Sequence, residues 1–214
     1  EAGPAKRIRL RGTGNKIITG LGGRGFALEA ASASGVSCYG NAEVLLDYAT
    51  VAGGRHPTMN TYSFTDLFEN CTDLRRAPDL GSETLTSMCY YGMFKGCTKL
   101  DDVRALPAFN AQSYCYAAMF YGCTSLKATP EMGMTVAADH CCTQMFAYCT
   151  SLESGPTSLT VRPADQCFSE MFLDCSALLT APDLGSTITA PYCYYKMFEG
   201  CSALKKPPQI LADS

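Results

Sequence analysis

A pattern of apolar positions recurs at one fixed interval along most of this chain. Each copy has a Phe, a Cys three residues later and a Leu three residues after that, as in Phe120, Cys123 and Leu126. The phenylalanines keep a 26-residue period without a slip, at Phe68, Phe94, Phe120, Phe146, Phe172 and Phe198. A fixed period of about 20 to 50 residues is the signature of a solenoid, whose units stack because none buries its apolar face alone. The pattern therefore predicts six stacked units over residues 61–214.

Within each unit, apolar residues four positions apart predict a short amphipathic helix. In the third unit Cys115 and Met119, and also Tyr116 and Phe120, would form one stripe facing the core. The residues able to cap these helices are Thr61, Ser87, Ser113, Asp139 and Asp165, with Pro191 in the last unit. Two residues after each Phe, four of the six units have Gly or Asn, which tolerate the left-handed conformation that ends a helix.

The segment after the motif Leu predicts a short strand, for example over residues 126–132. A Thr or Ser follows each motif Cys and is suited to bond the turn backbone. Pro130 removes a ladder donor, so we expect strands of about three to five residues. The predicted fold class is α/β: a solenoid with short helices on one side and a parallel sheet of short strands on the other.

Residues 1–60 do not carry the repeat and predict a β-rich N-terminal cap, followed by the six-unit solenoid at 61–214. Strands are expected at 6–10, 16–19 and 26–30, and a short helix at 41–49 with Asn41 as its N-cap. The glycine run at 20–25 lacks the order of a phosphate-binding loop and predicts a flexible turn. A solenoid needs such a cap to shield its terminal unit.

The charge balance argues against two classes of partner. The net charge is −3, and only 17% of the residues are charged. Because Lys and Arg do not cluster, we expect no binding to nucleic acid. No run reaches the roughly 18 apolar residues of a membrane span, so we expect no membrane insertion of this fragment.

Thirteen cysteines suggest a disulfide framework, but their spacing favours buried thiols. Six belong to the motif, and Cys89, Cys115, Cys141, Cys167 and Cys193 form a second column of the same period. Stacked residues lie about one strand spacing apart, which a disulfide tolerates, so distance leaves bridges open. However, stacked side chains point in parallel, and free Cys is readily buried. We therefore expect reduced thiols.

The sequence offers few groups for catalysis. His56 and His140 are far apart, and Cys141 beside His140 belongs to a buried column, so it is expected to be a structural thiol rather than a nucleophile. The cysteines also lack the short pairs of a zinc site. We expect no enzyme activity, no cofactor and no metal.

Two columns of changing polarity are the candidate partner-binding surface. The residues directly after the motif Leu are Arg75, Asp101, Lys127, Glu153, Leu179 and Lys205. A second column near the strand end holds Asp79, Glu131 and Asp183. Solenoids of this kind bind partners through an extended face, although an ordinary solvated face remains the simpler interpretation of any one residue.

The tandem motif MFxGC(T/S)SL, followed by a Pro-containing strand, resembles the BspA-like class of bacterial leucine-rich repeats over about residues 61–210. The 26-residue period and the Met-Phe pair mark a variant of it. This resemblance implies a leucine-rich-repeat fold in a cell-surface or extracellular bacterial protein, often a lipoprotein or anchored module. It also implies adhesion, through a protein or glycan partner on a host or neighbouring cell. A structural spacer and an accessory domain of a larger surface enzyme are the alternatives.

Overall fold

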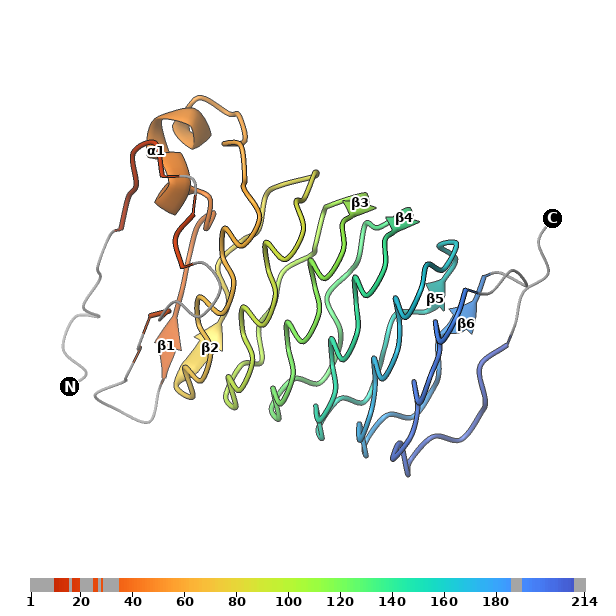
Figure 1. Cartoon of the computed structure of the whole chain (residues 1–214). Coiled ribbons are helices and arrows are strands. Elements are labelled where there is room, and N and C mark those ends of the chain that lie inside the picture. Colours follow the sequence, from red (N-terminus) through yellow and green to blue (C-terminus); the bar gives the residue numbers. More distant parts are fainter. Residues whose placement is uncertain are drawn as a thin grey trace, which may run out of the picture.

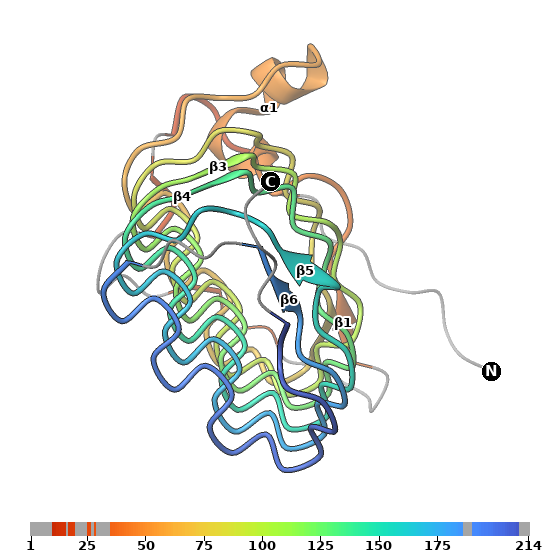
Figure 2. The same ribbon diagram turned by 90° about the vertical axis from the view of Figure 1, so that its right-hand side faces the viewer.

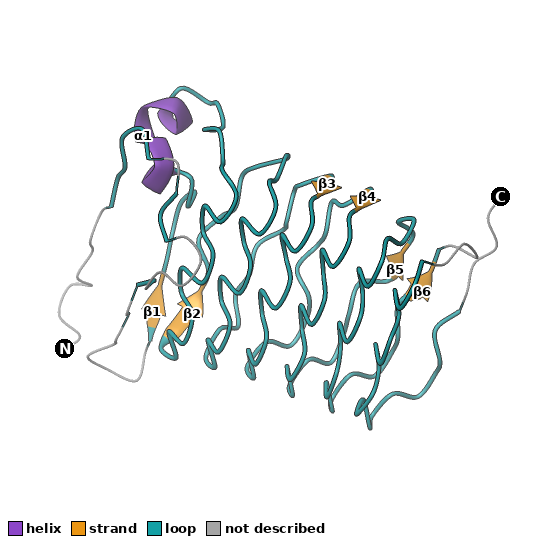
Figure 3. Cartoon of the chain, in the orientation of Figure 1, coloured by secondary structure: helices purple, strands orange, loops and turns teal. Residues whose placement is uncertain are grey.

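The computed structural model describes residues 10–15, 17–19, 25–26, 28, 35–185 and 190–209. The predicted strands at 6–10, 16–19 and 26–30 and the glycine run at 20–25 lie wholly or partly outside the described residues. Over the described part, coils of the chain lie side by side in sequence order (Figure 1), with one helix at the N-terminal end (Figure 3). In the view turned by 90°, successive coils are nested with a stepwise offset (Figure 2).

The helix α1 spans Val44–Ala52, later than the predicted 41–49. The N-cap is Glu43, whose side chain makes no capping hydrogen bond, so the prediction of Asn41 as N-cap is wrong. Asn41 Oδ1 instead accepts from the N–H of Glu43 at 2.8 Å, in the turn that precedes the helix. Asp47 has non-helical dihedrals, φ −152° and ψ 103°, and its carboxylate accepts from the N–H of Ala49 at 3.1 Å. The helix is therefore two short turns joined at Asp47.

The short helices predicted in the repeat units are wrong, because these residues form linked β-turns instead. We call residues 112–123 of the third unit, and the equivalent residues of the other units, the turn face. The N–H of Met119 donates to the carbonyl of Tyr116 at 3.2 Å, and Ala118 at the third turn position has φ 52°. A positive φ at this position alone defines a type II turn. Tyr114 and Gly122 repeat this conformation four positions either side.

The backbone N–H groups of the turn face alternate between bonds within the turns and bonds to the next unit. Every second N–H donates to a carbonyl of the following unit, as from Phe120 to Met145 at 2.9 Å. The residues predicted as helix caps are part of this ladder, since the carbonyl of Ser87 accepts from Tyr62 at 3.4 Å. Apolar residues four positions apart therefore still form one stripe, because the β-turns repeat every four residues.

All these inter-unit N–H groups point toward the next unit in sequence, so the two ends of the ladder differ chemically. At the first unit, the carbonyls of Ser63 and Leu67 accept from the N–H groups of Ile18 and Phe26 at 2.8 and 2.7 Å. At the sixth unit the equivalent donors have no acceptor within the described residues; they are the N–H groups of Tyr192, Tyr194, Lys196, Phe198 and Gly200.

Aromatic rings and thiols fill the core behind the turn face. Successive motif phenylalanines stack nearly parallel, as Phe94 on Phe120 with centroids 5.5 Å apart and planes 10° apart. The thiol of Cys123 donates to the carbonyl of Phe94 at 3.2 Å, a contact that recurs at other motif cysteines. All thirteen cysteines are free thiols, and every one except Cys38 is buried. The predicted burial of both cysteine columns is confirmed.

The rest of each coil holds only short parallel strands. We call residues 127–137 of the third unit, and their equivalents, the return segment. The strand β1 (Val36–Ser37) pairs with β2 (Leu74–Arg76), and β3 (Asn110–Ala111) pairs with β4 (Val136–Ala137). The last pair is β5 (Ser158–Leu159) with β6 (Asp183–Leu184). The predicted parallel pairing is confirmed. In 126–132, however, only single bridges form, at Ala128 and Met132.

Candidate functional site

The first predicted column forms one exposed row across successive units, which we call the charged row; its members are Arg75, Asp101, Lys127, Glu153, Leu179 and Lys205. Backbone hydrogen bonds join each pair of neighbours in this row except Asp101 and Lys127, as from Glu153 N–H to Lys127 C=O at 2.9 Å. Lys205 N–H donates likewise to Leu179 C=O at 3.2 Å. Arg75 is half-buried and the other members are exposed. The structure therefore places these residues side by side.

The two ends of the charged row differ in how their charges are paired. Arg75 Nη1 lies 3.2 Å from Asp101 Oδ2, and next to it Arg76 Nη1 lies 2.6 Å from Asp102 Oδ2. Within the described residues, Lys127, Glu153 and Lys205 form no ion pair. The later units therefore present charges that no neighbouring side chain neutralises.

The second predicted column is not brought together as one cluster. Asp79 Oδ1 lies 3.7 Å from Arg76 Nη2 and 3.8 Å from Arg104 Nε. Glu131 is exposed two units later. Asp183 begins β6, where its N–H donates to Thr157 C=O at 3.0 Å, so the return segment of the fourth unit lies between it and Glu131. Asp183 lines a groove of about 300 Å³ beside residues 206–209, and Glu131 lines a larger one.

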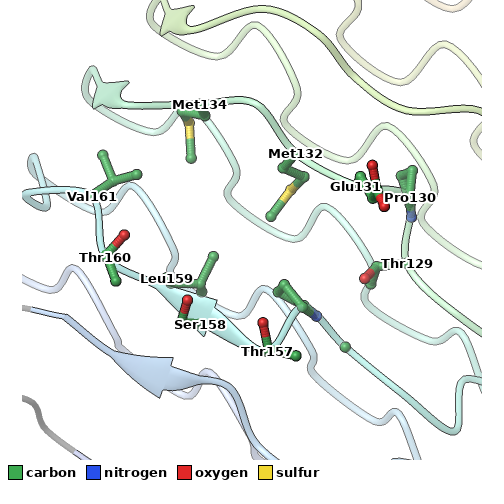
Figure 4. A pocket seen from close by; sticks show the side chains of 12 residues that line it. Thr129, Pro130, Glu131, Met132, Met134, Thr157, Ser158, Leu159, Thr160 and Val161 are labelled. Carbon is green, nitrogen blue, oxygen red and sulfur yellow. The ribbon is translucent and has the colours of Figure 1, made fainter.

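This groove lies between the return segments of the third and fourth units and has a volume of about 560 Å³. From one wall Met132 and Met134 point toward Leu159 and Val161 on the other (Figure 4). Met134, Leu159 and Val161 are buried and form an apolar floor. Hydroxyl side chains and one carboxylate, that of Glu131, complete the lining.

The groove opens because the parallel ladder between units is interrupted there. Thr129 N–H still donates to Ser154 C=O at 3.2 Å. Beyond it, no backbone hydrogen bond joins residues 130–137 to 155–163 in this fully described stretch. The strands β4 and β5 belong to different sheets, and their ribbons lie apart in Figure 1.

A one-residue slip in the fourth unit explains the interruption. The bridge between Ser154 and Thr180 keeps the period of the repeat, whereas the pairing of Ser158 with Asp183 is one residue short of it. The fourth unit therefore has one extra residue, as in a β-bulge, within 155–157. Such a slip reverses which way each following backbone group points. Thr157 C=O and Leu159 C=O bond to the fifth unit. Because backbone groups alternate in direction along a strand, the N–H and C=O of Ser158 point toward the third unit.

The thiols of the turn face are poor candidates for nucleophiles. Burial holds the pKa of Cys115 and Cys123 well above the usual value, so the reactive thiolate is disfavoured. Cys141 is also fully buried, with Met134 Sδ and Cys142 Sγ at 4.0 and 3.7 Å. No group of three His, Cys, Asp or Glu side chains that could hold a metal ion occurs among the described residues.

A buried carboxylate near the N-terminal end was not predicted from the sequence. Glu43 is fully buried, and its Oε2 lies 2.7 Å from His56 Nδ1 and 2.9 Å from Asn41 Nδ2. The imidazole of His56 is about half exposed. This pair joins the start of α1 to the segment entering the first unit. The only sequence signal was the polar Asn41-x-Glu43 step before an apolar run.

Comparisons with protein-family models, with curated proteins and with solved structures found no match to this chain. Over the described residues, no helix is both long and apolar enough to span a membrane.

Proposed function

We propose that this chain is a non-catalytic recognition module that binds a protein or glycan partner through its repeat surface. In this proposal the fold is a leucine-rich-repeat solenoid of the BspA-like class. The module belongs to an adhesive protein or lipoprotein at the cell surface or outside the cell. The supporting observations are the recurring motif, the parallel pairing of successive units and the rows of changing side chains beside a constant core. Fold alone does not imply function, so the surface carries the argument.

The charged row is the observation that carries this proposal. Its backbone is held by inter-unit hydrogen bonds, whereas its side chains change from unit to unit. In the later units these charges remain exposed and unpaired, within the described part of the chain. Complementary charges give specificity and speed association between proteins. A rigid backbone limits the entropy cost of binding because little has to be ordered.

The test is binding of the purified chain to panels of extracellular-matrix proteins and glycans, measured by biolayer interferometry. We expect saturable binding to at least one probe, reduced at least fivefold by the double variant Lys127→Ala, Glu153→Ala. The matched control is Arg75→Ala, Asp101→Ala, which removes charges that already neutralise each other. Absence of saturable binding on both panels would favour the spacer or accessory-domain alternative.

A further inference from the structure

We propose that the groove between the third and fourth units receives an extended polypeptide segment of a partner protein, which adds as a strand between the two walls. This inference rests on the proposed recognition function and names the class of partner for one site on its surface. Strand addition uses main-chain hydrogen bonds for affinity and side-chain pockets for specificity.

The backbone of each wall supplies unpaired donors and acceptors. On the third unit, Glu131 C=O and Gly133 N–H both bond to Leu106, at 2.8 and 2.9 Å. Because backbone groups alternate in direction along a strand, Met132 N–H and C=O point into the groove. The N–H and C=O of Ser158 point into the groove from the fourth unit. Neither Met132 nor Ser158 has a backbone hydrogen-bond partner within the described chain.

These two walls do not reach each other. In a parallel ladder, one residue bonds to the two residues that flank its opposite number. Leu159 pairs with Leu184, which lies two periods after Met132, so Leu159 is the residue opposite Met132. Ser158 and Thr160 flank Leu159, but no backbone hydrogen bond joins either of them to Met132 in this fully described stretch. An intervening strand has two edges of its own, so it can pair with Met132 on one side and with Ser158 on the other.

The side chains lining the groove fit a peptide better than a small polar ligand. Leu159 and Val161 form an apolar floor for alternate residues of an extended chain. Met132 and Met134 are flexible and polarizable, which suits contact with varied side chains. Glu131 is the one charged residue in the lining, so we expect a Lys or Arg in the bound segment.

The test is selection of random dodecapeptides displayed on phage against the purified chain, with counter-selection against Ser158→Pro. This proline removes the N–H that points into the groove, and leaves the atoms of Thr157 and Leu159 that bond to the fifth unit. Proline is tolerated on an edge of this kind. Ser158→Ala is the matched control, since it removes the hydroxyl and keeps the N–H. Circular dichroism and the thermal midpoint check the fold of both variants.

We expect selected peptides to bind wild type and Ser158→Ala within twofold, and Ser158→Pro at least tenfold more weakly. Methylating alternate backbone nitrogens of a selected peptide should abolish its binding to the wild-type chain, which tests strand pairing without any protein variant. Failure to enrich any peptide, or equal binding to Ser158→Pro, would overturn the inference. Panel binding that depends on Lys127 and Glu153 but not on Ser158 would leave the proposed function standing and this inference refuted.

Discussion

The turn face and the return segments belong to the same coils but are held in different ways. On the turn face, every second N–H bonds to the next unit from the first unit to the fifth, and the phenylalanine stack runs unbroken from Phe68 to Phe198. In the return segments, pairing is limited to single bridges and strands of two or three residues. One face is a continuous ladder and the other an interrupted one.

The difference shows where the repeat sequence is constrained and where it is free. A ring such as Phe120 contacts equivalent rings on both sides, so a change there disturbs three units. The return segment of the fourth unit has an extra residue, yet the turn face beyond it keeps its register from Phe146 to Phe172. Variation therefore accumulates on the interrupted side, where the groove opens.

The largest expected effect is loss of stability at alkaline pH, because the turn face carries most of the buried thiols. Burial raises the pKa of Cys89 and Cys149 to about 12 from an ordinary value of 9.0. The unfolded chain ionises these thiols above pH 9 while the folded chain keeps them neutral. The contribution of these buried thiols to the free energy of unfolding is thus complete below pH 9. It is lost as the pH rises toward 12, at about 1.4 kcal/mol per pH unit for each thiol.

Thermal unfolding followed by circular dichroism between pH 7 and pH 10.5, with reductant present, checks this prediction. The midpoint should be nearly constant to about pH 8.5 and then fall steeply, since many thiols act together. A midpoint that does not change between pH 8 and pH 10 would show that the thiols are not buried as described.

The next effect compares the same residue type on the two faces. Phe120 is fully buried in the stack, whereas Phe109 in a return segment is 45% exposed. Phe120→Ala should lower the free energy of unfolding by about 3 to 5 kcal/mol. Phe109→Ala should change it by less than about 1 kcal/mol. Urea unfolding of both variants measures the difference, and similar losses would contradict the contrast between the faces.

A pair of adjacent alanines distinguishes the linked turns from the helices that the sequence predicted. Ala117 and Ala118 are both buried, but only Ala118 has a positive φ, 52°. In a helix, each Ala→Gly change would cost about 1 kcal/mol. On linked turns, Ala117→Gly should cost about that much, whereas Ala118→Gly should be neutral or stabilising by up to about 1 kcal/mol, because glycine removes the strain. Equal losses in urea unfolding would favour a helix.

The sequence predicted the repeat, the buried columns and the parallel pairing because these depend on which residues recur. It did not separate helix from linked turns, since both bring residues four apart onto one stripe. A helix advances about 100° per residue, so Cys115 and Cys123 would lie about 80° apart around it. Both are fully buried, with Met119 midway between them. This strict period of four was the available sequence signal.

The candidate site was predicted only in part. The charged row follows from the period, because residues one period apart become neighbours. The groove does not, since Pro130, Pro156 and Pro182 keep the period across the slip and hide it. The register is fixed by the pairing of whole strands, and the order of the residues alone does not state it.

The smallest expected effect concerns the charges of the return segments. Arg75 and Asp101 are both more than 40% exposed, so water and salt screen their attraction. A double-mutant cycle with Arg75→Ala and Asp101→Ala should give a coupling of at most about 0.5 kcal/mol, and about zero in 1 M salt. Lys127 and Glu153 occupy the same positions two units later without an ion pair, so their cycle is the matched control. A coupling above about 1 kcal/mol for Arg75 and Asp101 would mean that charge, and not only the turn-face ladder, holds the first two units together.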